Sequence, residues 1–462
     1  MSITGGTFTS KLLKGSFLLS MSSFFIRLVG LATTIMVLHS LGLAEYGLYK
    51  LVLATSGVFI GLLLGGFDAL VVNEAIRQNA DGNHGMVKKL FLEFVGMKFS
   101  IGLLLFTLVQ VGSPLLLRWI DPGVVALLPI VSYQFLFIAL ERPMGFIFNF
   151  FARFRPIALM PLLDESMKFS LVLFFVAHLG WQAYGVLLAD VLATGFVVLL
   201  FVPHALSLGR KIVAVEGERG SPLWWIIRTY GKWAIAGRYL DEVRKSIRPW
   251  LIKFFLGTEA VAIYALAESF VGQVATLVPL SSVFAPLLPR ELKNRERVRN
   301  LVIVGTKYGT PLFIAIAAAA AVAVPSLILF LFPSYTPSIP IFLIMIIGVS
   351  TTAFASVITS VLYAERRQRA QFFITLTTVL FMVLAGAYLV RTFGLLGMAF
   401  EFLITMVFYN SLKLVSLLSS CPELRFRPSE LFSWSEKDRQ FIHSLKSSSQ
   451  HRLQIFFSHL NS

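Results

Sequence analysis

The chain has very little cysteine. Cys421 is the single cysteine among its 462 residues, which excludes an intrachain disulfide and a metal site built on cysteines. The sequence also has no metal-spaced histidine pair, no glycine-rich phosphate loop of the nucleotide-binding type and no nucleophile elbow. These absences predict a protein that is not an enzyme, with no metal site and no cofactor.

Charge is scarce as well. Charged residues make up 14% of the chain, against about 25% in an average soluble protein. Hydrophobic residues make up 56%, and the mean hydropathy is +0.79. Apolar runs of about 20 residues, the length that crosses a bilayer as a helix, predict an all-α polytopic membrane protein with about twelve spans. The predicted spans are about 15–40, 47–72, 90–112, 124–151, 158–178, 183–203, 226–252, 258–284, 300–324, 338–363, 370–390 and 394–418.

The positions of Lys and Arg between these spans predict the orientation, because cytoplasmic loops retain basic residues. If the amino terminus is inside, the outer loops contain only Arg118, Lys253 and Arg391, and the inner segments contain many more basic residues. Both termini are then cytoplasmic. The formal net charge of +16 is explained by this distribution and by a cationic cavity, not by nucleic-acid binding, since the basic residues are scattered over short loops.

The seventh predicted span, 226–252, contains unusually many charges for bilayer depth. A charged side chain there is unfavourable by about 2.5–3.5 kcal/mol, so such residues usually face a cavity. Arg238, Asp241, Glu242, Lys245 and Arg248 fall within an arc of about 120° on one side of a helix. The alternative is an amphipathic helix on the membrane surface. We favour a crossing helix, because without this crossing every later loop would move to the other side of the membrane, and the basic loops would no longer be cytoplasmic.

Two halves of the chain repeat each other. Leu41-Gly42 followed by Tyr49 is echoed by Leu256-Gly257 followed by Tyr264. Each half has six predicted spans, so the repeats are parallel, an arrangement typical of transporters with a site between the halves. The predicted organisation is a six-helix lobe at 1–203, a cytoplasmic linker at 204–225, a six-helix lobe at 226–418 and a polar cytoplasmic tail at 419–462.

Several of these segments resemble a known family. The Leu41-Gly42-Leu43-Ala44-Glu45-Tyr46-Gly47-Leu48-Tyr49 junction, Tyr363-Ala364-Glu365-Arg366 and Phe393-Gly394-Leu395-Leu396-Gly397 are similar to the Wzx-like oligosaccharide flippases of the multidrug/oligosaccharidyl-lipid/polysaccharide (MOP) superfamily. The resemblance implies two six-helix lobes forming a V in a bacterial cytoplasmic membrane. It also implies transport of a polyprenyl-diphosphate-linked sugar to the outer leaflet for cell-surface polysaccharide synthesis, with other polysaccharide-assembly proteins as partners.

Such a cargo has an anionic diphosphate that needs cations on its path. Guanidinium groups bind phosphate through two parallel charge-assisted hydrogen bonds. We therefore predict that Arg27 in the first span faces the seventh span across a central cleft. The predicted substrate-binding residues are Arg27, Arg238, Arg244, Lys245 and Arg248. Asp241 and Glu242 either hold these cations in place between cycles or simply neutralise them.

Other intramembrane charges have weaker assignments. Glu141 with Arg142, and Asp164 with Lys168, are predicted to be local structural pairs. Four carboxylates have no obvious local cation and could bind a coupling proton or sodium ion. These are Asp68, Asp190, Glu268 and Glu401.

Two other functions remain open. A drug or cation antiporter of the same superfamily needs an acidic pocket, whereas the predicted cleft is net positive. A membrane polysaccharide polymerase or ligase needs large outer loops, whereas the predicted outer loops have about ten residues or fewer. Both properties favour the flippase.

Overall fold

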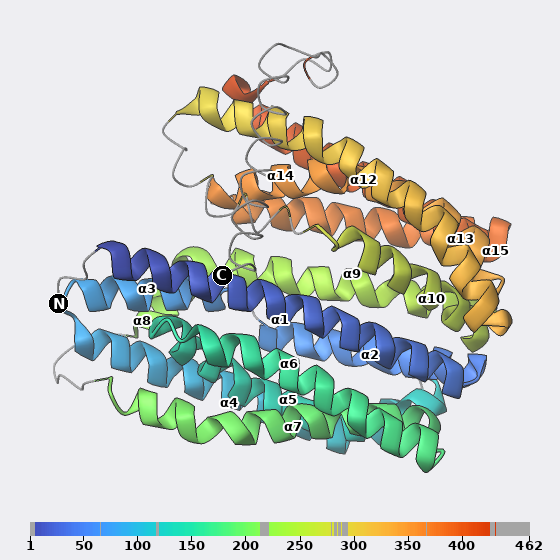
Figure 1. Cartoon of the computed structure of the whole chain (residues 1–462), viewed down its shortest axis with the longest axis horizontal. Helices are drawn as coiled ribbons and strands as arrows, with labels where there is room; N and C mark the ends of the chain where they lie inside the picture. The colour runs from blue at the N-terminus through green and yellow to red at the C-terminus, as the bar shows by residue number, and fades with distance from the viewer. Residues whose placement is uncertain are drawn as a thin grey trace, which may run out of the picture.

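The computed structural model describes residues 5–64, 66–116, 120–212, 221–278, 294–365 and 367–425, with isolated positions at 280, 284, 288 and 430. Every regular element in these ranges is helical, and the long helices run side by side (Figure 1). The first half of the chain contains α1 (Gly5–Ser40), α2 (Leu43–Leu64), α3 (Asp68–Ala80), α4 (His84–Leu116), α5 (Pro122–Phe150), α6 (Phe154–Val172) with a π-helical extension to His178, and α7 (Gln182–Gly209).

The second half begins with a short α8 (Pro222–Ile226) and a π-helical turn. It continues with α9 (Lys232–Leu256), α10 (Thr258–Ala275), α12 (Arg295–Leu331), α13 (Ser338–Ile346), α14 (Thr352–Ala364) and α15 (Gln368–Ser420). Most predicted spans coincide with one of these helices or with a part of one. Three run over two helices: 47–72 covers most of α2 and the start of α3, 226–252 covers the end of α8, the π-helical turn and most of α9, and 338–363 covers α13, a 3₁₀ turn and most of α14. The predicted eleventh and twelfth spans lie in α15, which is interrupted at Gly394 (φ 59°, ψ −138°), a conformation that glycine adopts readily.

Eight of the described helical stretches are long and apolar enough to cross a membrane. They are Leu18–Ser40, Leu43–Ala80, His84–Leu115, Pro122–Phe150, Gln182–Gly209, Arg295–Leu331, Ser338–Ala364 and Gln368–Ser420. The polytopic prediction is therefore supported. In the predicted linker, 204–209 belongs to α7 and 222–225 to α8, and 213–220 lies outside the described residues. The predicted tail falls largely outside them, at 426–429 and 431–462.

The two halves pack mainly within themselves. In the first half, α1 packs against α6 and α4 against α5; in the second, α12 packs against α14 and α9 against α15. Contact between the halves is concentrated where α2 packs against α9 and α10. Figure 1 shows α12 and α14 lying farther from the first-half helices near α3 and α8 than at the opposite end of the molecule.

The charged helix α9 runs within the bundle, alongside α2 and α15, and not across its ends (Figure 1). Glycines on α2 allow the close approach. A Cβ at Gly61 would lie 3.0 Å from Glu242 Cβ, and a Cβ at Gly57 would lie 3.5 Å from Ser246 Oγ. This packing supports a helix among the spans over the surface-lying alternative.

The halves also meet at the end of the molecule opposite α3. Asp121 caps the N-terminus of α5 by accepting a hydrogen bond from Gly123 N, and its other oxygen lies 2.8 Å from Lys253 Nζ near the end of α9. Tyr46 of α2 packs edge-on against Tyr335, with ring centroids 6.0 Å apart. These contacts join the halves at this end.

The Asp121–Lys253 pair predicts a pH-dependent stability. The hydrogen bond from Lys253 holds the pKa of Asp121 below its ordinary value of 3.8. The stabilisation is therefore present above about pH 4 and is lost as the pH falls through the pKa of the folded state. Asp121→Asn keeps the cap and removes the charge, so we expect a loss of about 1 kcal/mol or less at pH 7. The unfolding temperatures of variant and wild type in detergent should converge as the pH falls below the pKa of Asp121 in the folded state. A difference that persists undiminished in acid would contradict the assignment.

Candidate functional site

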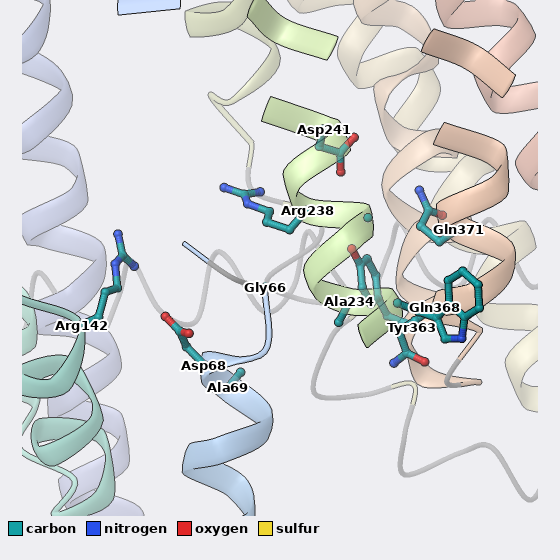
Figure 2. A pocket seen from close by; sticks show the side chains of 12 residues that line it. Gly66, Asp68, Ala69, Arg142, Ala234, Arg238, Asp241, Tyr363, Gln368 and Gln371 are labelled. Carbon is teal, nitrogen blue, oxygen red and sulfur yellow. The ribbon is translucent and has the colours of Figure 1, made fainter. Parts of the chain in front are cut away.

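A cavity of about 340 Å³ lies between the two halves (Figure 2). The first half contributes the α2–α3 break and one side chain of α5. The second half contributes one face of α9, the end of α14 and the start of α15. The lining residues are Gly66, Asp68, Ala69, Arg142, Trp233, Ala234, Gly237, Arg238, Asp241, Tyr363, Gln368 and Gln371.

Arg238 forms the second-half wall. Gly66 has φ +56°, and a Cβ there would lie 2.8 Å from both Ala234 O and Arg238 Cβ, so glycine is required by backbone and space together. The Arg238 side chain is 44% exposed, and its Nη2 lies 3.1 Å from Glu242 Oε1. Figure 2 shows its guanidinium extending toward the side where Asp68 and Arg142 lie. Part of its hydrogen-bonding capacity is therefore available to a ligand.

Arg142 of α5 lies on the opposite side of the cavity. Its Nε is buried and has no hydrogen-bond partner among the described residues, and none of their ion pairs includes this side chain. A buried N–H group without a hydrogen-bond partner is energetically unfavourable, and a bound anion would satisfy it. The sequence interpretation of Arg142 as half of a structural pair with Glu141 is not supported, since no such ion pair is present in the described part of the chain.

The break between α2 and α3 is stabilised by a buried lysine. Lys98 of α4 is fully buried, donates a hydrogen bond of 2.5 Å to Leu63 O at the end of α2, and lies 2.8 Å from Asp68 Oδ1 at the start of α3. The ammonium thus meets the partly negative end of one helix, and Asp68 the partly positive start of the next. This arrangement fixes the polar segment that lines the cavity.

The predicted charged face of α9 divides into three environments. Glu242 pairs with both Arg238 and Lys245, the latter at 2.9 Å, and Lys245 is 57% exposed. Asp241 lies 3.6 Å from Arg244, which also packs on the Tyr409 ring. Asp241 and Glu242 therefore each pair with cations of α9, but of the residues in these pairs only Arg238 and Asp241 line the cavity.

The last member of the face, Arg248, lies deeper. It is buried, and its Nε donates a hydrogen bond of 2.8 Å to Glu401 of α15. This guanidinium is already satisfied by its carboxylate. Its predicted role in substrate binding is not supported by the geometry, and a structural role fits better.

Arg27 is half-buried on α1, which packs mainly against α6, and it does not line the cavity. The predicted position of Arg27 opposite Arg238 is therefore not found in this cavity, and its role in substrate binding stays a prediction. The first-half arginine that shares the cavity is Arg142.

Three of the four carboxylates predicted to lack a cation have one. Asp68 pairs with Lys98, Glu401 with Arg248, and Asp190 with Lys168 at 2.5 Å. Lys168 thus reaches across to Asp190 on α7. The pair with Asp164, which the local spacing predicted, is not formed within the described residues. Glu268 of α10 differs, because no hydrogen bond or ion pair within the described residues includes it.

Sequence reasoning missed Arg142 as a cavity residue, together with Trp233, Gln368 and Gln371. The available signal was that Arg142 lies at bilayer depth next to Pro143, but its neighbour Glu141 suggested a local pair. No group of three His, Cys, Asp or Glu residues within the described ranges could hold a metal ion.

The model of the polysaccharide biosynthesis protein family matches residues 12–292, more than half of the chain. The chain belongs to this family. It is a multi-pass membrane transporter and not an enzyme, as predicted. A search of curated proteins finds no match.

The fold is similar to that of solved transporters of the MOP superfamily. An inward-facing multidrug resistance MATE family transporter matches with a TM-score of 0.75 at 14% identity, covering 86% of this chain and 95% of that one. A MOP superfamily transporter from Pyrococcus furiosus, described as having a binding pocket of reversed polarity, matches with a TM-score of 0.64 at 14% identity, covering 91% of this chain and 97% of that one. The lipid II flippase MurJ in an inward closed conformation matches with a TM-score of 0.58 at 14% identity, covering 90% of this chain and 89% of that one.

Proposed function

We propose that this transporter is a flippase that moves a polyprenyl-diphosphate-linked oligosaccharide across a bacterial cytoplasmic membrane for cell-surface polysaccharide synthesis. The observation that carries the proposal is the pair of guanidinium groups, Arg142 and Arg238, on opposite sides of one cavity between the halves. A diphosphate has oxygens on two phosphorus atoms, so two planar donors can bind it from two sides.

The charge balance of the cavity favours an anion. Asp68 and Asp241, which also line it, each have another cation, Lys98 and Arg244. Arg142 has no described partner. An unpaired positive charge attracts a phosphate and disfavours the cationic drugs of the alternative antiporter. The multidrug name of one structural neighbour therefore gives no reason to assign this chain a drug.

The transport cycle follows from the arrangement of the halves. In this proposal they are two six-helix lobes related by a parallel repeat, with both termini cytoplasmic, and the cavity opens to the cytoplasm. Rocking of one lobe against the other around α2, α9 and α10 would give alternating access. The contacts at Asp121–Lys253 and Tyr46–Tyr335 would then separate when the cavity opens outward.

Glu268 is our candidate for binding a coupling proton or sodium ion. The other three predicted carboxylates are occupied by cations, whereas Glu268 has no described hydrogen bond or ion pair and lies on α10, at the contact between the halves. An intramembrane carboxylate at a moving interface is suited to that role.

Filling the cavity tests the proposal. A Cβ at Gly237 would meet no atom within 4 Å, so Gly237→Leu adds bulk to the cavity wall without a backbone clash. We expect flipping of a fluorescent polyprenyl-diphosphate sugar in proteoliposomes to fall about tenfold or more, because the head group loses its space. The matched control is Gly96→Leu on an exposed position of α4, where a Cβ also meets nothing.

Unchanged flipping by Gly237→Leu at equal protein levels would reject this cavity as the path. Export of a cationic dye by the wild type, without flipping of the lipid-linked sugar, would favour the antiporter.

A further inference from the structure

A second cavity, of about 300 Å³, lies beside the first and is formed entirely by the first half, between α3, α4 and α5. We call it the side cavity. It shares Asp68, Ala69 and Arg142 with the cavity between the halves, so Arg142 stands in the wall of both. The other lining residues are Val72, Asn73, Phe94, Glu141, Gly145, Phe146 and Asn149.

The side cavity has a polar rim over an aromatic floor. Phe94 and Phe146 are buried and pack against each other, with ring centroids 5.8 Å apart. On the rim, Asn149 donates a hydrogen bond of 2.7 Å to Gly145 O through its Nδ2, and its Oδ1 accepts none from the described residues. Asn73 and Glu141 make no hydrogen bond or ion pair within the described ranges.

These rim groups match the chemistry of a sugar ring. Carboxylate and amide oxygens accept hydrogen bonds from hydroxyl groups, and amide N–H groups donate to hydroxyl oxygens. Apolar atoms under a few convergent polar groups are typical of small-molecule sites. The acyl tail of a lipid is an unsuitable occupant, since it would leave Glu141 and both amides desolvated without partners.

We infer that the side cavity binds the sugar residue attached directly to the diphosphate, while the diphosphate lies between Arg142 and Arg238. This inference rests on the proposed function. Arg142 provides the connection, because it borders both cavities and a sugar is linked to its phosphate by a single oxygen. A volume of about 300 Å³ is near the lower limit for small-molecule sites, so the cavity takes the first sugar and leaves the rest of the glycan outside.

Glu141 adds a selectivity. Its carboxylate accepts hydrogen bonds from a neutral sugar but repels a second carboxylate at short range. A neutral hexose or N-acetylhexosamine therefore fits the first position, and a uronic acid there does not.

The test compares two probes on the purified full-length protein. One is farnesyl diphosphate, which has no sugar; the other is farnesyl diphosphate linked to N-acetylglucosamine. We expect the wild type to bind the sugar-bearing probe about tenfold more tightly. Gly145→Leu should remove this difference and leave the affinity for farnesyl diphosphate unchanged, because a Cβ at Gly145 meets no atom within 4 Å and the added side chain occupies the side cavity.

Asn149→Ala is a milder change at the same rim. We expect it to weaken the affinity for the sugar-bearing probe about threefold and to leave the affinity for farnesyl diphosphate unchanged. Gly96→Leu is the control for a helical glycine outside both cavities. Equal affinity of the wild type for the two probes, or equal weakening of both by Gly145→Leu, would overturn the inference while the proposed function stands. If neither probe binds the wild type, the proposed function fails together with the inference.

Discussion

Replacing Arg142 and Arg238 with alanine together is expected to reduce flipping of a polyprenyl-diphosphate sugar by about a thousandfold. A hydrogen bond to a charged group contributes about 1.5–3 kcal/mol, and each 1.4 kcal/mol corresponds to a factor of ten. Each single variant should therefore lose about ten- to a hundredfold. The readout is the initial flipping rate in proteoliposomes at matched protein levels, measured at low and high salt. The wild-type rate should fall with salt, because phosphate binding is electrostatic.

Arg→Lys variants at both positions refine this test. A lysine keeps the charge but not the planar pair of donors, so we expect an intermediate rate. Arg27→Ala should retain most of the activity, because Arg27 lies outside the cavity. If Arg27→Ala is as impaired as Arg142→Ala, the first-half cation predicted from the repeat regains its role. Wild-type rates in both Arg142→Ala and Arg238→Ala would reject the two-sided diphosphate site.

Removing one partner of the Arg248–Glu401 pair is expected to destabilise the folded protein by about 3–5 kcal/mol, because the remaining charge stays buried without a partner. Glu401 is fully buried, and its Oε1 also accepts a hydrogen bond of 2.6 Å from Thr405. Thermal unfolding of detergent-solubilised Glu401→Ala should therefore occur at a clearly lower temperature than that of the wild type.

The double variant Arg248→Met with Glu401→Leu is the control. It removes both charges, so most of the stability should return. If the double variant instead loses as much stability as the two single variants together, the two side chains act independently. A Glu401→Gln variant that folds normally but loses its dependence on an ion gradient would instead return Glu401 to the ion-coupling role predicted from the sequence.

Hydropathy located the long apolar helices, because the need for about 20 apolar residues per crossing is a local property of the chain. It did not predict α3 and α8 as separate helices. The predicted eleventh span ends at 390 and the twelfth begins at 394, and α15 is interrupted at Gly394. The charged face of the seventh span was also visible from helical periodicity. The family followed from the resemblance of the segments 41–49, 363–366 and 393–397, and the match over residues 12–292 confirms it.

Tertiary structure decided which charges meet. Lys168 pairs with Asp190 on α7, and Lys98 with Asp68 at a helix break, although the sequence spacing favoured other partners or none. It also placed Arg142, and not Arg27, in the cavity with Arg238. Sequence periodicity gives the face of a helix but not the rotation and tilt at which that face meets another helix. Those are set by packing between distant segments, such as the glycines of α2 against α9, and they select the arginines that line the cavity.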